Sequence, residues 1–146
     1  MPIHDCPHSF HDLAMDVFSS YMNSLREKMT HPIPMAGFGI KGVGPKSLQR
    51  RFGLDHDLSG CYVLIDGRRA IYVGISRGVL KRIRNHVRGS THFAATLAYR
   101  IAATKHPHVM TASQAMQDTG FQMRFQESRN YLMGSGHCVR RDCQSS

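Results

Sequence analysis

The chain has 146 residues, of which 41% are hydrophobic, so it is long enough to bury one core and too short for two ordinary domains. It lacks the run of roughly 18 apolar residues that a membrane helix needs, and Met1–Phe10 has no secretory-signal pattern, so a cytoplasmic protein without membrane contact is expected. Nineteen Lys and Arg against ten Asp and Glu give a net charge of +9, which indicates either a nucleic-acid partner or a solvated basic surface.

The first predicted element is an amphipathic helix. Apolar residues recur at spacings of three and four from Phe10 to Leu25, Ser9 is a suitable N-cap, and Asp12 is favourable in the first turn. We expect the apolar face of this helix to pack into the core. The next stretch, His31–Ser59, is basic and rich in Pro and Gly, so it is predicted to be a long loop of the kind that often carries function.

A β-hairpin is predicted after this loop. The runs Gly60–Ile65 and Arg68–Ile75 are rich in β-branched and aromatic residues, and an Asp-Gly turn separates them. Helical spacing then predicts a helix from Val79 to Val87. Three further helical regions are expected, at Thr91–Thr104, after the capping box Thr111–Gln114, and along Phe121–Leu132.

From Gly134 onward the sequence has no usable periodicity. The expected organisation is an N-terminal amphipathic helix in residues 1–32, a folded domain in 33–133 and an irregular tail in 134–146. The fold class is α/β (α+β): a small antiparallel sheet containing the hairpin, flanked by helices. The tail gives no support for a third strand or for a final helix.

The cysteines indicate neither a disulfide framework nor a zinc site. Four cysteines are too few and too scattered for such a framework. Two groupings near the chain ends lack the short paired spacing of a zinc finger and are interpreted as chain termini. These groupings are His4, Cys6, His8 and His11, and then His137, Cys138 and Cys143.

Two short motifs lie on the predicted hairpin, and two polar residues follow on the next helix. The motifs are Gly60-Cys61-Tyr62 and Tyr72-Val73-Gly74, with the tyrosines ten residues apart; Arg82 stands ten residues after Tyr72, and His86 four later. This series resembles the GIY-YIG nuclease superfamily, in particular its small stand-alone or restriction-like members. Taken singly, each tyrosine is as compatible with strand packing and His86 with a helix surface, so the joint spacing carries the resemblance.

The same residues make chemical sense together. Tyr62 and Tyr72 on neighbouring strands can share one face, and Arg82 and His86 share one helix face. Arg82 can hold two phosphate oxygens, and a tyrosine or His86 can accept the proton of an attacking water. The resemblance implies a phosphodiester hydrolase acting on DNA with Mg²⁺ or Mn²⁺, with Gly60 and Gly74 as motif residues. The basic residues expected to bind nucleic acid are Arg77, Lys81, Arg84 and Arg88.

The sequence departs from the family at the metal site. The family places a metal-binding glutamate on a helix after its third strand, whereas Glu127, the only glutamate after Glu27, lies on the helix expected before that strand. No metal ligand is therefore identified. The codons possible for His137–Ser145, read one base forward, permit a strand-like sequence, which suggests a frameshift or truncation. We expect weak or absent cleavage; the alternatives are a non-catalytic nucleic-acid-binding module and a scaffold whose tyrosines only pack.

Overall fold

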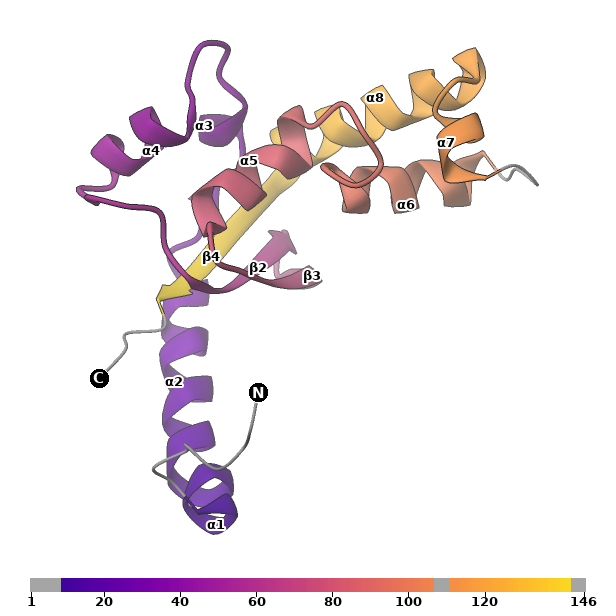
Figure 1. Ribbon diagram of the computed structural model, residues 1–146. Helices are drawn as coiled ribbons and strands as arrows, with labels where there is room; N and C mark the ends of the chain where they lie inside the picture. The colour runs from indigo at the N-terminus through magenta and orange to yellow at the C-terminus, as the bar shows by residue number, and fades with distance from the viewer. Residues whose placement is uncertain (1–8, 107–110, 143–146) are drawn as a thin grey trace. The chain divides into compact units, whose positions relative to one another are not determined.

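The computed structural model describes residues 9–106 and 111–142, with residues 135–142 described by their backbone (Figure 1). The chain separates into two compact units, residues 1–31 and 32–146. Each unit is considered by itself. Within the described residues, no helix is both long and apolar enough to cross a lipid bilayer.

The smaller unit is one continuous helical segment. It comprises α1 (Phe10–Asp12), the π-helical turn η2 (Leu13–Val17) and α2 (Phe18–Met29). The predicted N-cap is confirmed, because the Ser9 side chain accepts from the amide of Asp12 while the Asp12 carboxylate accepts from the amide of Ser9. No residue of these three segments is buried, so the unit taken by itself does not cover the apolar face, and packing of this face into a core stays a prediction. Periodicity identifies an amphipathic helix but not what covers its apolar face.

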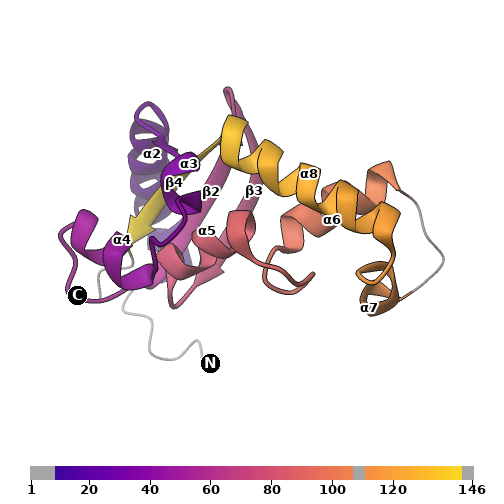
Figure 2. The same cartoon turned by 90° about the horizontal axis from the view of Figure 1, so that it is seen from above.

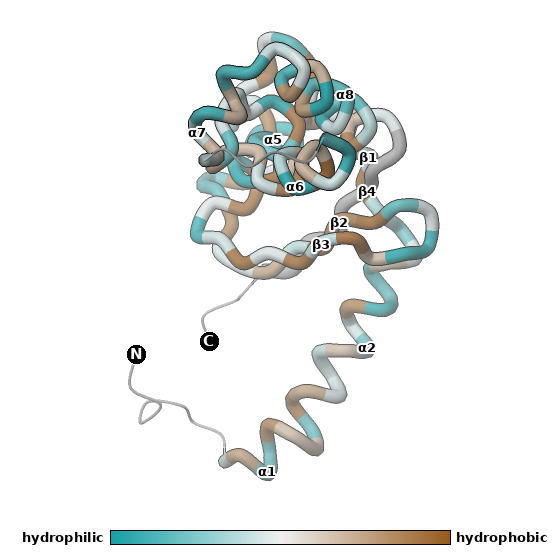
Figure 3. The backbone as a smooth tube through the Cα atoms, turned by 90° about the vertical axis from the view of Figure 1, so that its right-hand side faces the viewer, coloured by the Kyte–Doolittle hydropathy of each residue, from teal (hydrophilic) through white to brown (hydrophobic). Residues whose placement is uncertain are grey.

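The larger unit contains a four-stranded sheet in the order β1-β4-β2-β3. Strands β2 (Gly60–Asp66) and β3 (Arg69–Ser76) form the predicted antiparallel hairpin. Gly67 in its turn has a φ of 58°, a left-handed conformation that glycine adopts without strain. The apolar character of both strands is visible as brown segments in Figure 3.

Strand β4 (Gly136–Asp142) pairs antiparallel with β2 along its length and with β1 (Ile33–Pro34) on its other side. The prediction of an irregular tail and of no third strand is therefore wrong for residues 136–142. The polar sequence of this segment has no strand pattern, but backbone hydrogen bonds to the open edge of β2 do not depend on side-chain type. Residues 143–146 of the predicted tail lie outside the described residues.

Helices surround this sheet. The segment expected to be a loop contains β1 and the short helices α3 (Ala36–Gly39) and α4 (Pro45–Arg51), the latter with Pro45 in its first turn. After the hairpin come α5 (Val79–Arg88), α6 (Thr96–Lys105), α7 (Ala112–Ala115) and α8 (Thr119–Ser135). The predicted capping box at Thr111 and Gln114 is confirmed.

The core lies between these helices and one face of the hairpin. Helix α5 contacts both β2 and β3, and α6 lies beside α8 (Figure 2). The tightly packed residues come from every layer and are fully buried: Phe38, Leu48, Leu64, Leu80, Ile83, Phe121, Phe125 and Leu132. The burial of these apolar side chains is the main favourable contribution to the free energy that holds α5 against the hairpin.

Candidate functional site

The hairpin places the two tyrosines on one face of the sheet. Tyr62 in β2 lies opposite Gly74 in β3, and Tyr72 lies opposite Leu64, so the side chains of Tyr62 and Tyr72 point to the same side. Their ring centroids are 6.2 Å apart. Gly60, the other glycine of the two motifs, begins β2 opposite Ser76 and is buried.

Gly74 is required by the position of the Tyr62 ring. A Cβ atom at residue 74 would lie 2.4 Å from both Cζ and Oη of Tyr62, well inside van der Waals contact. Any other residue at this position would therefore displace the tyrosine. The Tyr–x–Gly motif thus has a packing reason that is independent of chemistry: the ring of Tyr62 lies across the backbone of the neighbouring strand.

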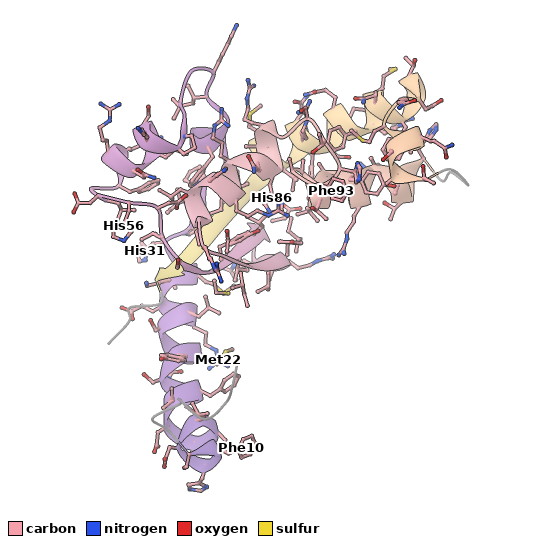
Figure 4. All side chains as sticks on the ribbon, viewed as in Figure 1. Phe10, Met22, His31, His56, His86 and Phe93 are labelled. Atoms are coloured by element: carbon pink, nitrogen blue, oxygen red, sulfur yellow. The ribbon has the colours of Figure 1, made fainter. Side chains whose placement is uncertain are left out.

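Helix α5 carries His86, which is labelled in Figure 4, and brings its ring against the rings of both tyrosines. Nε2 of His86 lies 2.8 Å from the phenolic oxygen of Tyr62, and its ring meets the ring of Tyr72 edge-on at 5.0 Å. His86 and Tyr62 are almost completely buried, whereas Tyr72 is only half buried. Tyr72 is therefore the member of this trio that solvent or a ligand reaches.

Burial controls the protonation of the two inner groups. It raises the pKa of Tyr62 to about 12, with Tyr72 adding to the rise and Arg82 opposing it. Burial and then the charge of Arg82 lower the pKa of His86 to about 4. Both side chains are thus neutral at pH 7. Nδ1 of His86 is buried and has no hydrogen-bond partner among the described residues.

Arg82 stands one helical turn before His86 and is held by the segment that follows α5. Its Nη1 donates to the carbonyl oxygens of Phe93 and Ala94, both at 3.0 Å, and its Nη2 donates to Oγ1 of Thr96 at 3.1 Å. The guanidinium is therefore fixed in direction before any ligand arrives. These partners were not predicted, because a backbone carbonyl carries no signature in the sequence.

A basic cleft of about 290 Å³ opens beside Arg82 at the start of α5. Two of the residues predicted to bind nucleic acid, Arg77 and Lys81, line it. Ser76 and Asn85 line it too and were not predicted, although Asn85 is four residues after Lys81 and so shares its helix face. The complete lining is Ser76, Arg77, Gly78, Lys81, Arg82 and Asn85.

The other two predicted nucleic-acid-binding residues lie outside this lining. Nε of Arg84 donates to the carbonyl oxygen of Val43 at 2.8 Å, so this side chain ties α5 to the segment between α3 and α4. Arg88 is exposed at the end of α5, where Arg129 donates to its carbonyl oxygen. Arg84 and Arg88 follow the same helical spacing of basic residues as Lys81, but neither side chain lines the cleft that Arg77 and Lys81 line.

Asp57 positions the start of α5 and was missed by the sequence analysis. Its Oδ1 accepts from the amides of Leu58 and Leu80 at 2.8 Å, and its Oδ2 accepts from the amide of Lys81 at 3.0 Å. Helix α5 has no side-chain cap of its own, because its N-cap residue is Gly78. The carboxylate of Asp57 therefore satisfies amides that the helix start leaves open and complements the helix dipole.

The described side chains offer no metal centre. No group of three His, Cys, Asp or Glu residues that could hold a metal ion occurs among them. Glu127 lies on α8, before β4 as expected, and is exposed and paired with Arg124 at 2.9 Å. Apart from His11, the two His/Cys groupings near the chain ends lie outside the residues whose side chains are described.

The geometry thus brings Tyr62, Tyr72 and His86 into contact with one another. Arg82, whose charge acts on both Tyr62 and His86, lines the basic cleft, whereas the two tyrosines and His86 are not part of its lining. Comparison of the chain with protein-family models, with curated proteins and with solved structures found no match.

Proposed function

We propose that this chain is a DNA endonuclease domain of the GIY-YIG type, in which the phosphate-binding half of the active site is formed. The observation that carries the proposal is the convergence of residues far apart in sequence. Tyr62, Tyr72 and His86 contact one another, and Arg82 lies one turn before His86 at the rim of a cationic cleft.

Each residue has a distinct role in this proposal. Arg77 and Lys81 neutralise the charge of a phosphodiester in the cleft, and the oriented guanidinium of Arg82 stabilises the charge that develops on phosphorus-bound oxygens. Tyr72, the accessible phenol, meets the attacking water or a phosphate oxygen. Tyr62 and His86 are too buried to meet the substrate and position Tyr72 from behind.

The resemblance implies Mg²⁺ or Mn²⁺, but the described residues around the cleft do not fit a divalent cation. Asp57, whose carboxylate lies beside Gly78 of the cleft lining, uses both oxygens to accept hydrogen bonds from backbone amides. The roles proposed for Arg77, Lys81, Arg82 and Tyr72 therefore involve no metal ion. Loss of one transition-state electrostatic contact typically costs about 10²–10³ in rate, and slow cleavage is the expectation for this chain.

A second candidate function is DNA binding without cleavage. The observation that favours it is the same lack of a metal-binding group among the described side chains. A cleft rimmed by Arg77, Lys81 and Arg82 binds phosphate by charge alone, and such binding needs no metal.

A plasmid-nicking experiment with Mg²⁺ or Mn²⁺ tests the first function. Tyr72→Phe removes only a hydroxyl, so the fold is retained, and we expect nicking to fall by at least about tenfold. The double variant Arg77→Ala/Lys81→Ala should weaken both nicking and binding. Arg100→Ala is the matched control, since it removes an exposed cation from α6, away from the cleft lining.

The results separate the two functions. Nicking that Tyr72→Phe does not reduce would refute the proposed site. Binding without nicking, measured by fluorescence anisotropy and falling steeply with salt, supports the second function. Absence of both nicking and salt-dependent binding rules out both candidates.

A further inference from the structure

The segment between α5 and α6 presents a whole aromatic ring to solvent. Phe93, labelled in Figure 4, is 77% exposed, whereas the other phenylalanines of the larger unit are buried or partly buried. A single exposed apolar side chain is common on a protein surface and indicates nothing by itself. The surroundings of Phe93 decide what its ring can do.

The backbone of Phe93 is joined directly to Arg82. The carbonyl oxygen of Phe93 accepts hydrogen bonds from Nη1 of Arg82 and from Oγ1 of Thr96, both at 3.0 Å. Oγ1 of Thr91 accepts from the next amide, that of Ala94, at 3.1 Å. Arg82 lines the basic cleft, and Phe93 does not. Since only Cα and Cβ separate this carbonyl group from the ring, the ring lies within one residue of a guanidinium that lines the cleft.

The ring of Phe93 is backed by other rings. The ring of His92 lies 3.9 Å from it, measured between centroids, and the ring of Tyr99 lies 5.7 Å from that of His92. Tyr99 in turn packs at 5.3 Å against Phe121, which is fully buried. A series of ring contacts therefore connects the exposed phenylalanine to the core. Such support reduces the side-chain freedom that is lost when a ligand binds.

We propose that the ring of Phe93 stacks on an unpaired base of a DNA strand whose phosphate lies at Arg82. A nucleotide carries a flat aromatic base beside a charged phosphate, and Phe93 and Arg82 place a flat apolar ring beside a cation. Sites for single-stranded nucleic acid combine a positively charged groove with exposed aromatic side chains in this way. Arg77 and Lys81 extend the positive charge along the cleft.

This inference rests on the proposed function, because it takes the cleft to bind phosphate. It adds a substrate class: a strand with at least one unpaired nucleotide at the site, rather than a fully paired duplex. A base stacks by its flat face, which every base has, so the contact with Phe93 selects unpaired bases without selecting a sequence.

Two labelled oligomers test the stacking with the full chain. One is a short oligodeoxythymidylate, the other is the same sugar–phosphate backbone without bases, and binding is measured by fluorescence anisotropy without divalent cations. Phe93→Ala should weaken binding of the first by roughly five- to 100-fold, the effect of losing one stacked base, and leave binding of the second unchanged. Met123→Ala is the matched control, since it removes a 62% exposed apolar side chain from α8 and should change neither affinity.

The variant Phe93→Trp reports the contact directly. The chain has no tryptophan, so this variant carries a single indole, at the proposed contact. The oligodeoxythymidylate should quench its fluorescence. The abasic oligomer should not, and neither should a duplex of the same length, whose bases are already paired.

The outcomes separate this inference from the proposed function. The double variant Arg77→Ala/Lys81→Ala should weaken both oligomers equally, because it removes only phosphate contacts. Stacking is overturned if Phe93→Ala changes neither affinity while the double variant lowers both, and the phosphate-binding cleft then stands. Equal weakening of both oligomers by Phe93→Ala also overturns stacking and assigns Phe93 to the positioning of Arg82.

Two further outcomes count against the inference. Quenching of Phe93→Trp by the duplex as strong as that by the single strand overturns the need for an unpaired base. A wild-type chain that binds neither oligomer overturns the proposed phosphate site, and this inference fails with it.

Discussion

His86 lies fully buried against two phenols, which couples its ionisation to the folding of the chain. Its pKa is lowered from 6.5 to about 4, first by burial and then by Arg82. Between these two pH values the unfolded chain binds a proton on His86 and the folded chain does not. Protonation therefore favours the unfolded state throughout that window.

The free energy of unfolding should accordingly decrease as the pH falls from 6.5 to about 4, and level off below that for this residue. The His86 contribution is on the order of 3 kcal/mol. His86→Gln keeps a polar group near Tyr62 but does not titrate, so it should flatten this part of the pH dependence. Urea unfolding at a series of pH values measures the effect, with exposed His56→Gln as the control. An equally steep fall in the His86 variant would contradict the assignment.

For single residues, the sequence was sufficient to predict which side chains of the candidate site meet, but not how deeply each of them is buried. The spacing of Tyr62, Tyr72 and His86 on a hairpin and a helix was sufficient to predict that they come together, because strand and helix periods fix which faces they share. It did not predict that Tyr62 and His86 are buried behind Tyr72. Depth depends on the surrounding layers, which no local pattern encodes.

The position of α5 depends on a residue outside the helix. Asp57, which lies before the hairpin, accepts three amide hydrogen bonds, two of them from the first turn of α5. The helix also carries Arg82 and His86, so Asp57 links the loop before β2 to the site without touching its side chains.

Asp57→Ala should destabilise the fold by about 1–2 kcal/mol, the usual effect of losing an N-terminal cap. Asp55→Ala, two residues earlier and exposed, removes the same charge without removing these hydrogen bonds and should have a small effect. Urea unfolding of both variants makes the comparison. Equal stability of the two variants would show that Asp57 does not hold the helix.

Helices and strands with a long apolar pattern could be predicted from the sequence, whereas short helices could not. The hairpin and α5 have clear patterns and were predicted close to their observed bounds. Helices α3 and α4 were missed, since they are short and lie among Pro and Gly residues that favour turns. Helix α6 begins at Thr96 rather than Thr91, because residues 91–95 form turns, and the carbonyls of Phe93 and Ala94 there accept from Arg82.

Strand β4 joins the beginning of the larger unit to its hairpin, since it pairs with β1 on one side and β2 on the other. The sequence could not predict this strand, because its pairing comes from partners about 70 and 100 residues earlier rather than from its own pattern.

Truncation after Ser135 should therefore strongly destabilise or aggregate the larger unit, because it leaves β2 with an unpaired edge. Truncation after Asp142 retains every strand pair in the described sheet and serves as the control. Thermal unfolding and light scattering distinguish the two proteins. A stable, monodisperse chain ending at Ser135 would show that β4 contributes little.

The central place of β4 also has a consequence for the time course of synthesis. Residue 136 is synthesised about 70 residues after the end of β2, which at roughly 5–20 residues per second is a delay of several seconds. Throughout that interval the hairpin exists with β2 open, and hairpins form in microseconds. During synthesis the chain therefore passes through a stage in which the open edge of β2 is available for pairing with another chain.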